Sequence, residues 1–212
     1  DEPKSIGYIA PFYGNFGILV RAYAYMVSLG KEGLLATSNR AVLNANYLRE
    51  RLRSSFGIET SERCMHEFVF SGEFLKKNGI HVLDIAKGFI DKGFHPPTIY
   101  FPLNVPEAIM IEPTESENLE EINRFCNALL SIKDEINKID SGKYDKKDNP
   151  IINAPHTYLE LSGDEWKHSY SRKEAAFPKT YLKDYKYWAP VARVDNVYGD
   201  RNLVCSCPSM EE

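Results

Sequence analysis

The sequence predicts an α/β (α+β) fold, in which helices cover a sheet of a few strands, followed by an irregular C-terminal tail. Two observations predict it. As far as residue 139, apolar residues at helical spacing alternate with short apolar runs; beyond residue 140 the chain is rich in aromatic residues and has little periodicity. Between these parts, residues 141–150 are polar and rich in turn-forming residues. The sequence therefore divides into residues 1–139 and residues 140–212.

The first predicted helix spans residues 34–56. Its apolar residues recur at steps of three and four and share one face: Ala41, Ala45, Leu48, Leu52 and Phe56. Gly57 is a suitable C-cap, because glycine readily adopts the left-handed conformation in which many helices end. A short strand is predicted next, over residues 65–70.

Two more helices and a second strand complete the first part. Residues 82–92 predict a helix with one apolar side, and Gly93 ends it. Residues 108–112 form an apolar run between two prolines, which is typical of a buried strand. The last helix spans residues 117–139, and its acidic first turn complements the positive end of the helix dipole.

The tail from residue 140 lacks the periodicity of a separate core. Its many tyrosines and its two tryptophans can each bury a large area, so we expect it to wrap a surface that already exists. Lys and Arg nearly balance Asp and Glu between residues 140 and 188, which argues against an electrostatic docking arm.

Composition excludes several classes of protein. The chain has 212 residues, of which 43% are hydrophobic and 26% charged, enough for one good-sized core. No apolar run approaches the roughly 20 residues of a membrane span. The net charge of −4 disfavours nucleic acid as the main partner, because phosphate backbones require a basic face. The acidic start at Asp1 is unlike a signal peptide, and the missing initiator Met suggests a processed product or an excised fragment.

The cysteines and histidines match no standard metal or nucleophile motif. Four cysteines are too few for a disulfide scaffold and have the wrong spacing for a four-ligand zinc site, so we expect no metal and a soluble protein of a reducing compartment. His66 precedes Glu67, but no second histidine follows at the spacing of a zinc protease.

Three short segments are candidates for a site. His95 lies in residues 93–98, Gly-Phe-His-Pro-Pro-Thr, where two prolines fix the backbone; this is either a small-ligand site or a stiff connector. Gly14 and Asn15 precede an apolar helix, whose first N–H groups suit an anion such as a phosphate. Cys205 and Cys207 are either ordinary tail residues or an oxidisable pair.

Together these segments make the sequence recognisable. Residues 44–47, 66–68, 93–98 and 110–117 resemble glycine dehydrogenase (decarboxylating), the pyridoxal-phosphate-dependent P-protein of the glycine cleavage system. Residues 170–172, 175–178, 192–200 and 203–208 resemble the C-terminus of the same family. Residues 1 to about 135 are more similar to the second subunit of the two-subunit form, whereas the tail is more similar to the single-chain form.

The resemblance implies the small C-terminal domain of a fold type I pyridoxal-phosphate enzyme, with an extra tail. In this family the lysine that binds the cofactor lies in a large upstream domain, after a His and before a glycine-rich run. No lysine here has that setting; Lys4, Lys31, Lys76, Lys77, Lys87 and Lys92 all stand in polar or helix-surface contexts. We therefore expect no catalytic residue in this chain and no activity from it alone.

The resemblance also implies an activity and candidate residues. The whole enzyme decarboxylates glycine on pyridoxal phosphate and transfers the aminomethyl group to the lipoyl arm of the H-protein. We expect His95, Thr98 and His66 on the substrate side, and Gly14 and Asn15 at the cofactor phosphate. Oxidation of Cys205 or Cys207 would tether the tail over the entrance of the site.

The implied partners are the lipoyl-bearing H-protein, the upstream pyridoxal-phosphate domain, and further subunits in a homodimer or heterotetramer. Neither nucleic acid nor a membrane is among them. The expected location is the bacterial cytoplasm, or the mitochondrial matrix in a eukaryote. The alternative is a non-catalytic docking or regulatory module that binds the lipoyl protein.

Overall fold

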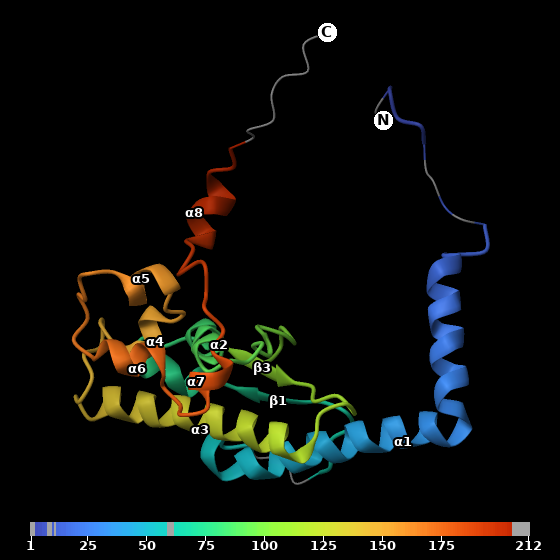
Figure 1. Ribbon diagram of the computed structural model, residues 1–212, viewed down its shortest axis with the longest axis horizontal. Helices are drawn as coiled ribbons and strands as arrows, with labels where there is room; N and C mark the ends of the chain where they lie inside the picture. The colour runs from blue at the N-terminus through green and yellow to red at the C-terminus, as the bar shows by residue number, and fades with distance from the viewer. Residues whose placement is uncertain (1–2, 8–9, 11, 59–61, 205–212) are drawn as a thin grey trace.

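The computed structural model describes residues 3–7, 10, 12–58 and 62–204, and Figure 1 shows its elements. The first part contains α1 (Phe16–Phe56), β1 (Phe68–Ser71), the 3-10 helix η1 (Glu73–Asn78), α2 (Val82–Asp91), β2 (Thr98–Ile99), β3 (Ala108–Ile111) and α3 (Leu119–Asp140). Five short helices follow: α4 (Pro150–Asn153), α5 (Tyr158–Ser162), α6 (Arg172–Ala176), α7 (Leu182–Tyr185) and α8 (Asn196–Arg201).

The three strands form one antiparallel sheet in the order β1-β3-β2. Phe68 pairs with Ile111 and Phe70 pairs with Ile109, and these four side chains are buried on the same face. The predicted mixture of helices with a sheet of few strands is confirmed. The predicted strand over residues 65–70 begins later than expected, at Phe68.

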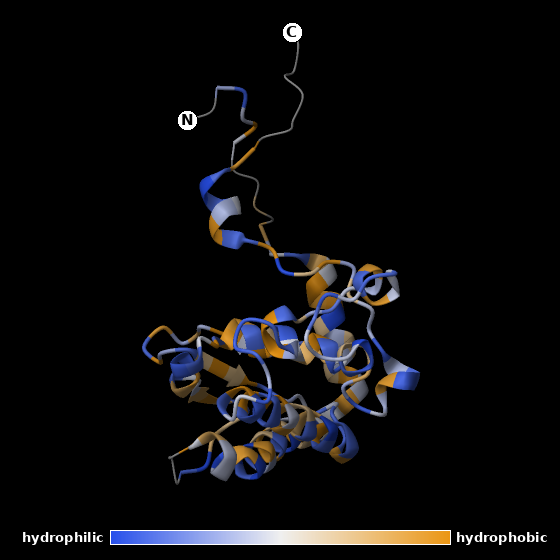
Figure 2. Cartoon of the chain, turned by 90° about the vertical axis from the view of Figure 1, so that its left-hand side faces the viewer, coloured by the Kyte–Doolittle hydropathy of each residue, from blue (hydrophilic) through white to orange (hydrophobic). Residues whose placement is uncertain are grey.

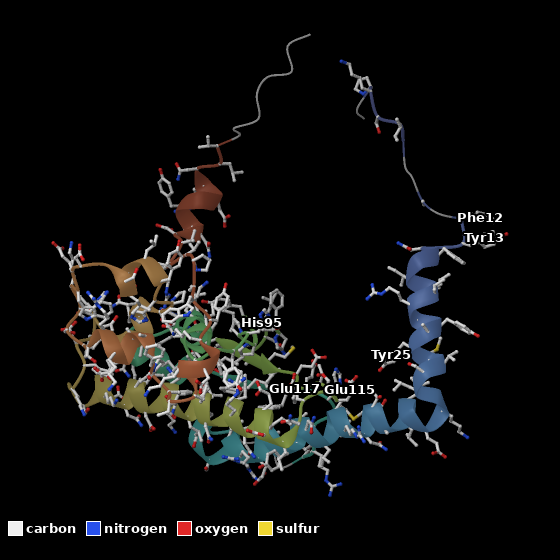
Figure 3. All side chains as sticks on the ribbon, in the orientation of Figure 1. Phe12, Tyr13, Tyr25, His95, Glu115 and Glu117 are labelled. Carbon is white, nitrogen blue, oxygen red and sulfur yellow. The ribbon has the colours of Figure 1, made fainter. Side chains whose placement is uncertain are left out.

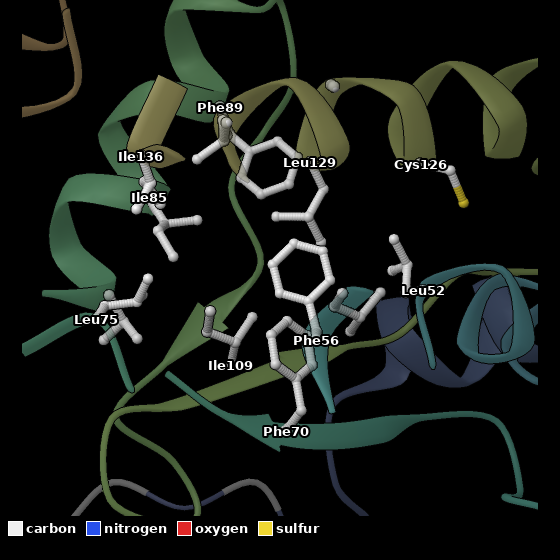
Figure 4. Close-up of a cluster of buried hydrophobic side chains, with 14 of the residues drawn as sticks. Leu52, Phe56, Phe70, Leu75, Ile85, Phe89, Ile109, Cys126, Leu129 and Ile136 are labelled. Atoms are coloured by element: carbon white, nitrogen blue, oxygen red, sulfur yellow. The ribbon is translucent and has the colours of Figure 1, made fainter. Parts of the chain in front are cut away.

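One hydrophobic core joins the sheet to α1, α2 and α3 (Figure 4). The predicted apolar faces supply it: Leu48, Leu52 and Phe56 from α1, Ile85 and Phe89 from α2, and the Ile122–Ile139 stripe of α3. The Phe56 and Phe70 rings lie 5.3 Å apart, so the end of α1 packs directly on the sheet. Gly57 ends α1 with φ of 61°, as its predicted role as a C-cap requires.

Helix α1 joins two predicted helices, the apolar one after Asn15 and the one over residues 34–56, across a kink. At this kink Gly30 departs from helical geometry at φ 63° and ψ −177°. Beyond this kink, residues 16–29 (hereafter the arm) turn away from the body of the protein (Figure 1). The arm exposes large apolar side chains: Phe16 is 77% exposed and Tyr23 66%.

Part of the tail enters the main core. Ile151 of α4 belongs to that core, and α4 contacts both α2 and α3. Leu161, Tyr170, Ala175 and Ala176 form a second, small cluster. Figure 2 shows the hydrophobic strands inside the body, with α8 extending from it. Over the residues described, no helix has the length and apolarity to cross a membrane.

Candidate functional site

The strongest candidate for a binding site is a pocket of about 390 Å³ that contains His95. Three segments line it: residues 93–97 between α2 and β2, residues 111–114 at the end of β3, and the first turns of α3. Leu48 of α1 closes one side. In the view of Figure 3, His95, Glu115 and Glu117 lie on the side of the body that faces the arm.

The residues before the two prolines are held by glycine geometry and aromatic packing. Gly93 has φ of 78°, which lets the Phe94 N–H turn back to the Phe89 carbonyl at 3.0 Å. The Phe94 ring meets Phe125 edge to face at 5.4 Å and carries the Arg124 guanidinium over its face at 4.3 Å. His95 therefore stands on a rigid support.

The polar lining of the pocket is acidic. Glu112, Glu117 and Glu121 line it, and neither Lys nor Arg is among its lining residues. Glu121 is already paired with Arg124, and this hydrogen bonding raises the pKa of the Arg124 guanidinium. The Asn44 side chain donates to the carbonyls of Thr114 and Glu117 at 2.9 and 3.2 Å, and so fixes the loop before α3.

The structure brings together only some of the predicted residues. His95 is exposed in the pocket, and its ring has no hydrogen-bond or ion-pair partner in the described part of the chain. His66 lies beside the pocket, with Nε2 3.9 Å from Glu112 Oε1. Thr98 is exposed on β2, pairs with Met110 and does not line the pocket.

The predicted cofactor and redox residues lie elsewhere. Gly14 and Asn15 precede the arm, whose far end lies near Phe12 and Tyr13 in Figure 3, well away from His95. The Asn15 side chain caps α1 by accepting from the Ile18 N–H at 3.3 Å. Cys205 and Cys207 lie outside the described residues. Cys64 and Cys126 are free thiols, and burial raises the pKa of both.

A buried polar network that the sequence did not reveal joins α2 to the tail. Asp91 Oδ2 lies 2.7 Å from His156 Nδ1, and His156 Nε2 lies 2.6 Å from the Tyr170 hydroxyl. Lys186, on the segment after α7, donates to the Asp91 carbonyl at 2.9 Å. Burial raises the pKa of Tyr170 far above its usual range, so its hydroxyl stays protonated. Because His156 and Tyr170 are both buried, we assign this network to holding the tail in place.

The buried pair of Lys92 and Glu135 contradicts a prediction made from the sequence. Lys92 was expected in a polar or helix-surface context, but it is only 2% exposed. Its Nζ contacts both carboxylate oxygens of Glu135 on α3, at 3.0 and 2.9 Å. The partner that makes this burial possible is 43 residues further along the chain.

His168 connects two segments of the tail and carries a pH prediction. Its Nδ1 lies 2.6 Å from Asp148 and its Nε2 2.8 Å from Glu160. Burial opposes protonation, but the bonds to Glu160 and Asp148 outweigh it and raise the pKa of His168 above 6.5. Burial likewise opposes ionisation of Asp148, but hydrogen bonds from His168 and Ser169 lower the Asp148 pKa to about 2.

Replacing His168 by alanine should therefore cost about 1–3 kcal/mol of unfolding free energy near pH 5. When folding raises the pKa of a histidine, its full contribution to stability is present at pH values below the pKa of the unfolded state. That contribution is lost as the pH rises through the pKa of the folded state. The difference in unfolding free energy between wild type and variant, measured by urea titration, should accordingly become smaller toward about pH 9. Replacing Lys167, whose pair with Glu165 is fully on the surface, is the control. A stability difference that grows as the pH rises would contradict the raised pKa of His168.

Among the described residues, no group of three or more His, Cys, Asp or Glu side chains is placed to hold a metal ion.

Comparison with known proteins relates the chain to one family. Residues 37–156 match the family model described as glycine dehydrogenase, C-terminal domain. Glycine dehydrogenase (decarboxylating) of Pelagibacter ubique is 50% identical over 204 residues, which are 94% of this chain and 21% of that protein. The proteins of the same name from Aliivibrio fischeri and Vibrio parahaemolyticus are 48% and 45% identical over 93% and 99% of the chain. The chain spans about a fifth of the length of these relatives.

Proposed function

The chain belongs to the family of the glycine dehydrogenase C-terminal domain, and from that premise we propose that it forms one wall of the glycine decarboxylation site of a longer enzyme. Residues 1–139 would be the small domain of a fold type I pyridoxal-phosphate architecture, and residues 140–212 a segment wrapped over it. The enzyme would release CO2 from glycine and transfer the aminomethyl group to the lipoyl arm of the H-protein.

The observation that carries this proposal is the arm. Between residues 16 and 29 the only charged residue is Arg21, and apolar side chains are exposed all around the helix. A helix that is apolar on every side is normally buried. The arm therefore fits a protein that packs against a larger body, and His95 faces the side on which that body would lie (Figure 3).

Pyridoxal phosphate would accept the electrons left when the carboxylate of glycine departs. In this chain, the feature suited to its phosphate is the start of α1. Gly14, with φ of 81°, leads into the helix, and in the described part of the chain the Phe16 and Gly17 N–H groups have no acceptor. Because Gly14 and Asn15 lie well away from His95, we propose that they contact the phosphate of a partner subunit's site across a dimer interface, and the lysine that holds the cofactor is expected in the upstream domain.

The wall around His95 would orient the substrate and exclude water. The His95 ring has unused hydrogen-bonding capacity at a rigid position, so it can donate to or accept a proton from a group in the pocket. His66 would act through Glu112, which lies beside it. Closing such a wall over the reacting carbon lowers the local polarity, in which loss of a carboxylate is easier than in water. Thr98 was expected on the substrate side, but it does not line the pocket; because it is exposed next to the pocket loop, we propose it instead as a contact to the upstream domain.

Borohydride reduction tests the proposal directly. The 212-residue chain, mixed with pyridoxal phosphate and reduced, should show no specific adduct by mass spectrometry. The full-length enzyme should carry one adduct on a lysine outside these residues. A specific adduct on a lysine of this chain would contradict the upstream assignment. No adduct on either protein would leave the docking module that binds the lipoyl protein as the better explanation.

Changing His95 to Asn in the full-length enzyme should lower the rate of glycine decarboxylation by about a hundredfold to ten-thousandfold, the range expected when a proton-exchanging group is lost. The cofactor absorbance should be unchanged, because His95 lies far from the proposed phosphate contacts. A rate within about twofold of wild type would remove His95 from the substrate side.

A further inference from the structure

A second cavity, of about 510 Å³, shares no lining residue with the His95 pocket. It lies between the end of α1, the 3-10 helix η1 and the C-terminal half of α3. Three core side chains labelled in Figure 4, Phe56, Leu75 and Ile136, form one side of it, hereafter the apolar wall. Its volume is within the range of small-molecule sites.

Asn78, the last residue of η1, brings an unused hydrogen-bond donor to this cavity. Its Nδ2 atom is buried and has no hydrogen-bond partner in the described part of the chain. A buried donor without an acceptor costs free energy, and few are found in folded proteins. Asn78 as a whole is only half-buried, and the terminal torsion of an asparagine is broad, so a small rotation turns Nδ2 toward the cavity.

Lys133 of α3 brings a cation to the same cavity. Its Nζ donates to the Ser55 carbonyl in the last turn of α1 and lies 5.5 Å from the centre of the Phe56 ring. The bond to Ser55 holds the ammonium in place but uses only one of its three N–H donors. Among the described residues Lys133 forms no ion pair, whereas Asp140, the carboxylate in the lining, is paired with Lys77 Nζ at 3.6 Å. The lining therefore has one positive charge without a counter-charge.

We propose that this cavity binds a small monocarboxylate with an apolar body. Lys133 Nζ and Asn78 Nδ2 would donate to the carboxylate oxygens, and the body of the ligand would lie on the apolar wall. A phosphate ester would bring about two negative charges to a single free cation and would face Asp140. The alternative occupant is water, which would satisfy Asn78 but would not favour an anion. The assignment does not depend on the proposed function, because the two pockets are separate.

Saturation-transfer NMR on the full-length enzyme tests the site with two probes of nearly the same shape. Hexanoate carries a carboxylate, and hexanamide carries a neutral group of similar size. Hexanoate should bind with a dissociation constant of about 1 mM or less, and hexanamide at least about tenfold more weakly. Added salt should weaken the binding of hexanoate alone, because it screens the attraction to Lys133. Saturating glycine should leave hexanoate bound, because glycine occupies the substrate site.

Variants of the lining locate the bound probe. Lys133→Met should weaken hexanoate binding about tenfold and leave hexanamide within about twofold, whereas Lys133→Arg, which keeps the charge, should stay within about threefold of wild type. Asn78→Asp replaces the amide by a carboxylate of the same size and should abolish hexanoate binding. The matched control is Lys143→Met, which removes the same charge from an exposed position outside the lining and should have no effect. Circular dichroism checks that each variant is folded.

Four outcomes would overturn the inference. Hexanoate could fail to bind, which would leave water as the occupant, or hexanamide could bind as tightly as hexanoate. Glycine could displace hexanoate, which would place the probe in the substrate site. Lys143→Met could weaken hexanoate as much as Lys133→Met does, which would indicate a general attraction of anions to the surface. If Lys133→Met does not fold, Asn78→Asp decides, and unchanged hexanoate binding by that variant counts against the site.

Discussion

Replacing Asp91 by alanine is expected to lower the free energy of unfolding by about 3–5 kcal/mol. Asp91 is 4% exposed, and its carboxylate accepts from the backbone N–H of His156 at 3.0 Å and contacts the His156 ring at 2.7 Å. Lys186 Nζ lies 3.7 Å from the same carboxylate, with its side chain only 2% exposed. Removing Asp91 leaves this buried ammonium without its counter-charge, which is far costlier than losing a surface pair. Urea unfolding measures the change.

The control is Asp184, an exposed residue of α7, whose replacement should change the free energy by less than about 0.5 kcal/mol. Because Asp91 ties α2 to two places in the tail, trypsin should also cleave the Asp91 variant after tail lysines sooner than it cleaves the Asp184 variant. If the Asp91 and Asp184 variants are equally stable and equally resistant to trypsin, the network does not hold the tail.

Replacing Glu135 by alanine should cost a similar amount, about 3–5 kcal/mol, because it leaves the Lys92 ammonium buried and unpaired. Lys92 lies at the C-terminal end of α2 and Glu135 in the C-terminal half of α3, so their pair joins two helices of the core. Unfolding in urea again provides the measurement. The tail lies against the same pair, since the Tyr181 hydroxyl donates to the Lys92 carbonyl at 2.8 Å.

A rescue variant distinguishes charge from packing. Lys92→Met/Glu135→Leu replaces both charges by apolar groups of similar size, and its stability should return to within about 1 kcal/mol of wild type. Should the double variant be as unstable as Glu135→Ala, the loss would come from packing around α3 rather than from the unpaired ammonium.

The helix faces and the core strands could be predicted because they depend on neighbours in sequence. The spacing of Leu48, Leu52 and Phe56 already defines the buried face of α1, and the alternation at Phe68 and Phe70 defines the inner face of β1. Strand β2 is only two residues long and is defined by its pairing with β3, so no local sequence pattern predicts it. The kink at Gly30 was likewise missed, because glycine occurs inside straight helices as well.

The candidate site was predicted in part. His95 and the two prolines after it stand out in the sequence, since a rigid turn carrying a histidine has a recognisable composition. The carboxylates beside it do not, because Glu112 and Glu117 read as a strand end and an ordinary acidic first turn. Their position around His95 follows from α3 packing next to the end of β3.

The helical and strand faces, the acidic balance of the chain and the resemblance to a glycine dehydrogenase C-terminal domain could all be predicted from the residues alone. Which charges are buried depends on the folded arrangement. Lys92, Asp91 and His156 look like surface residues when read locally, and each is buried because a partner far along the chain meets it in the fold. The periodicity of apolar residues depends only on neighbours within one or two helical turns. The cost of burying a charge, by contrast, is offset only by a specific partner that the fold brings within hydrogen-bond distance.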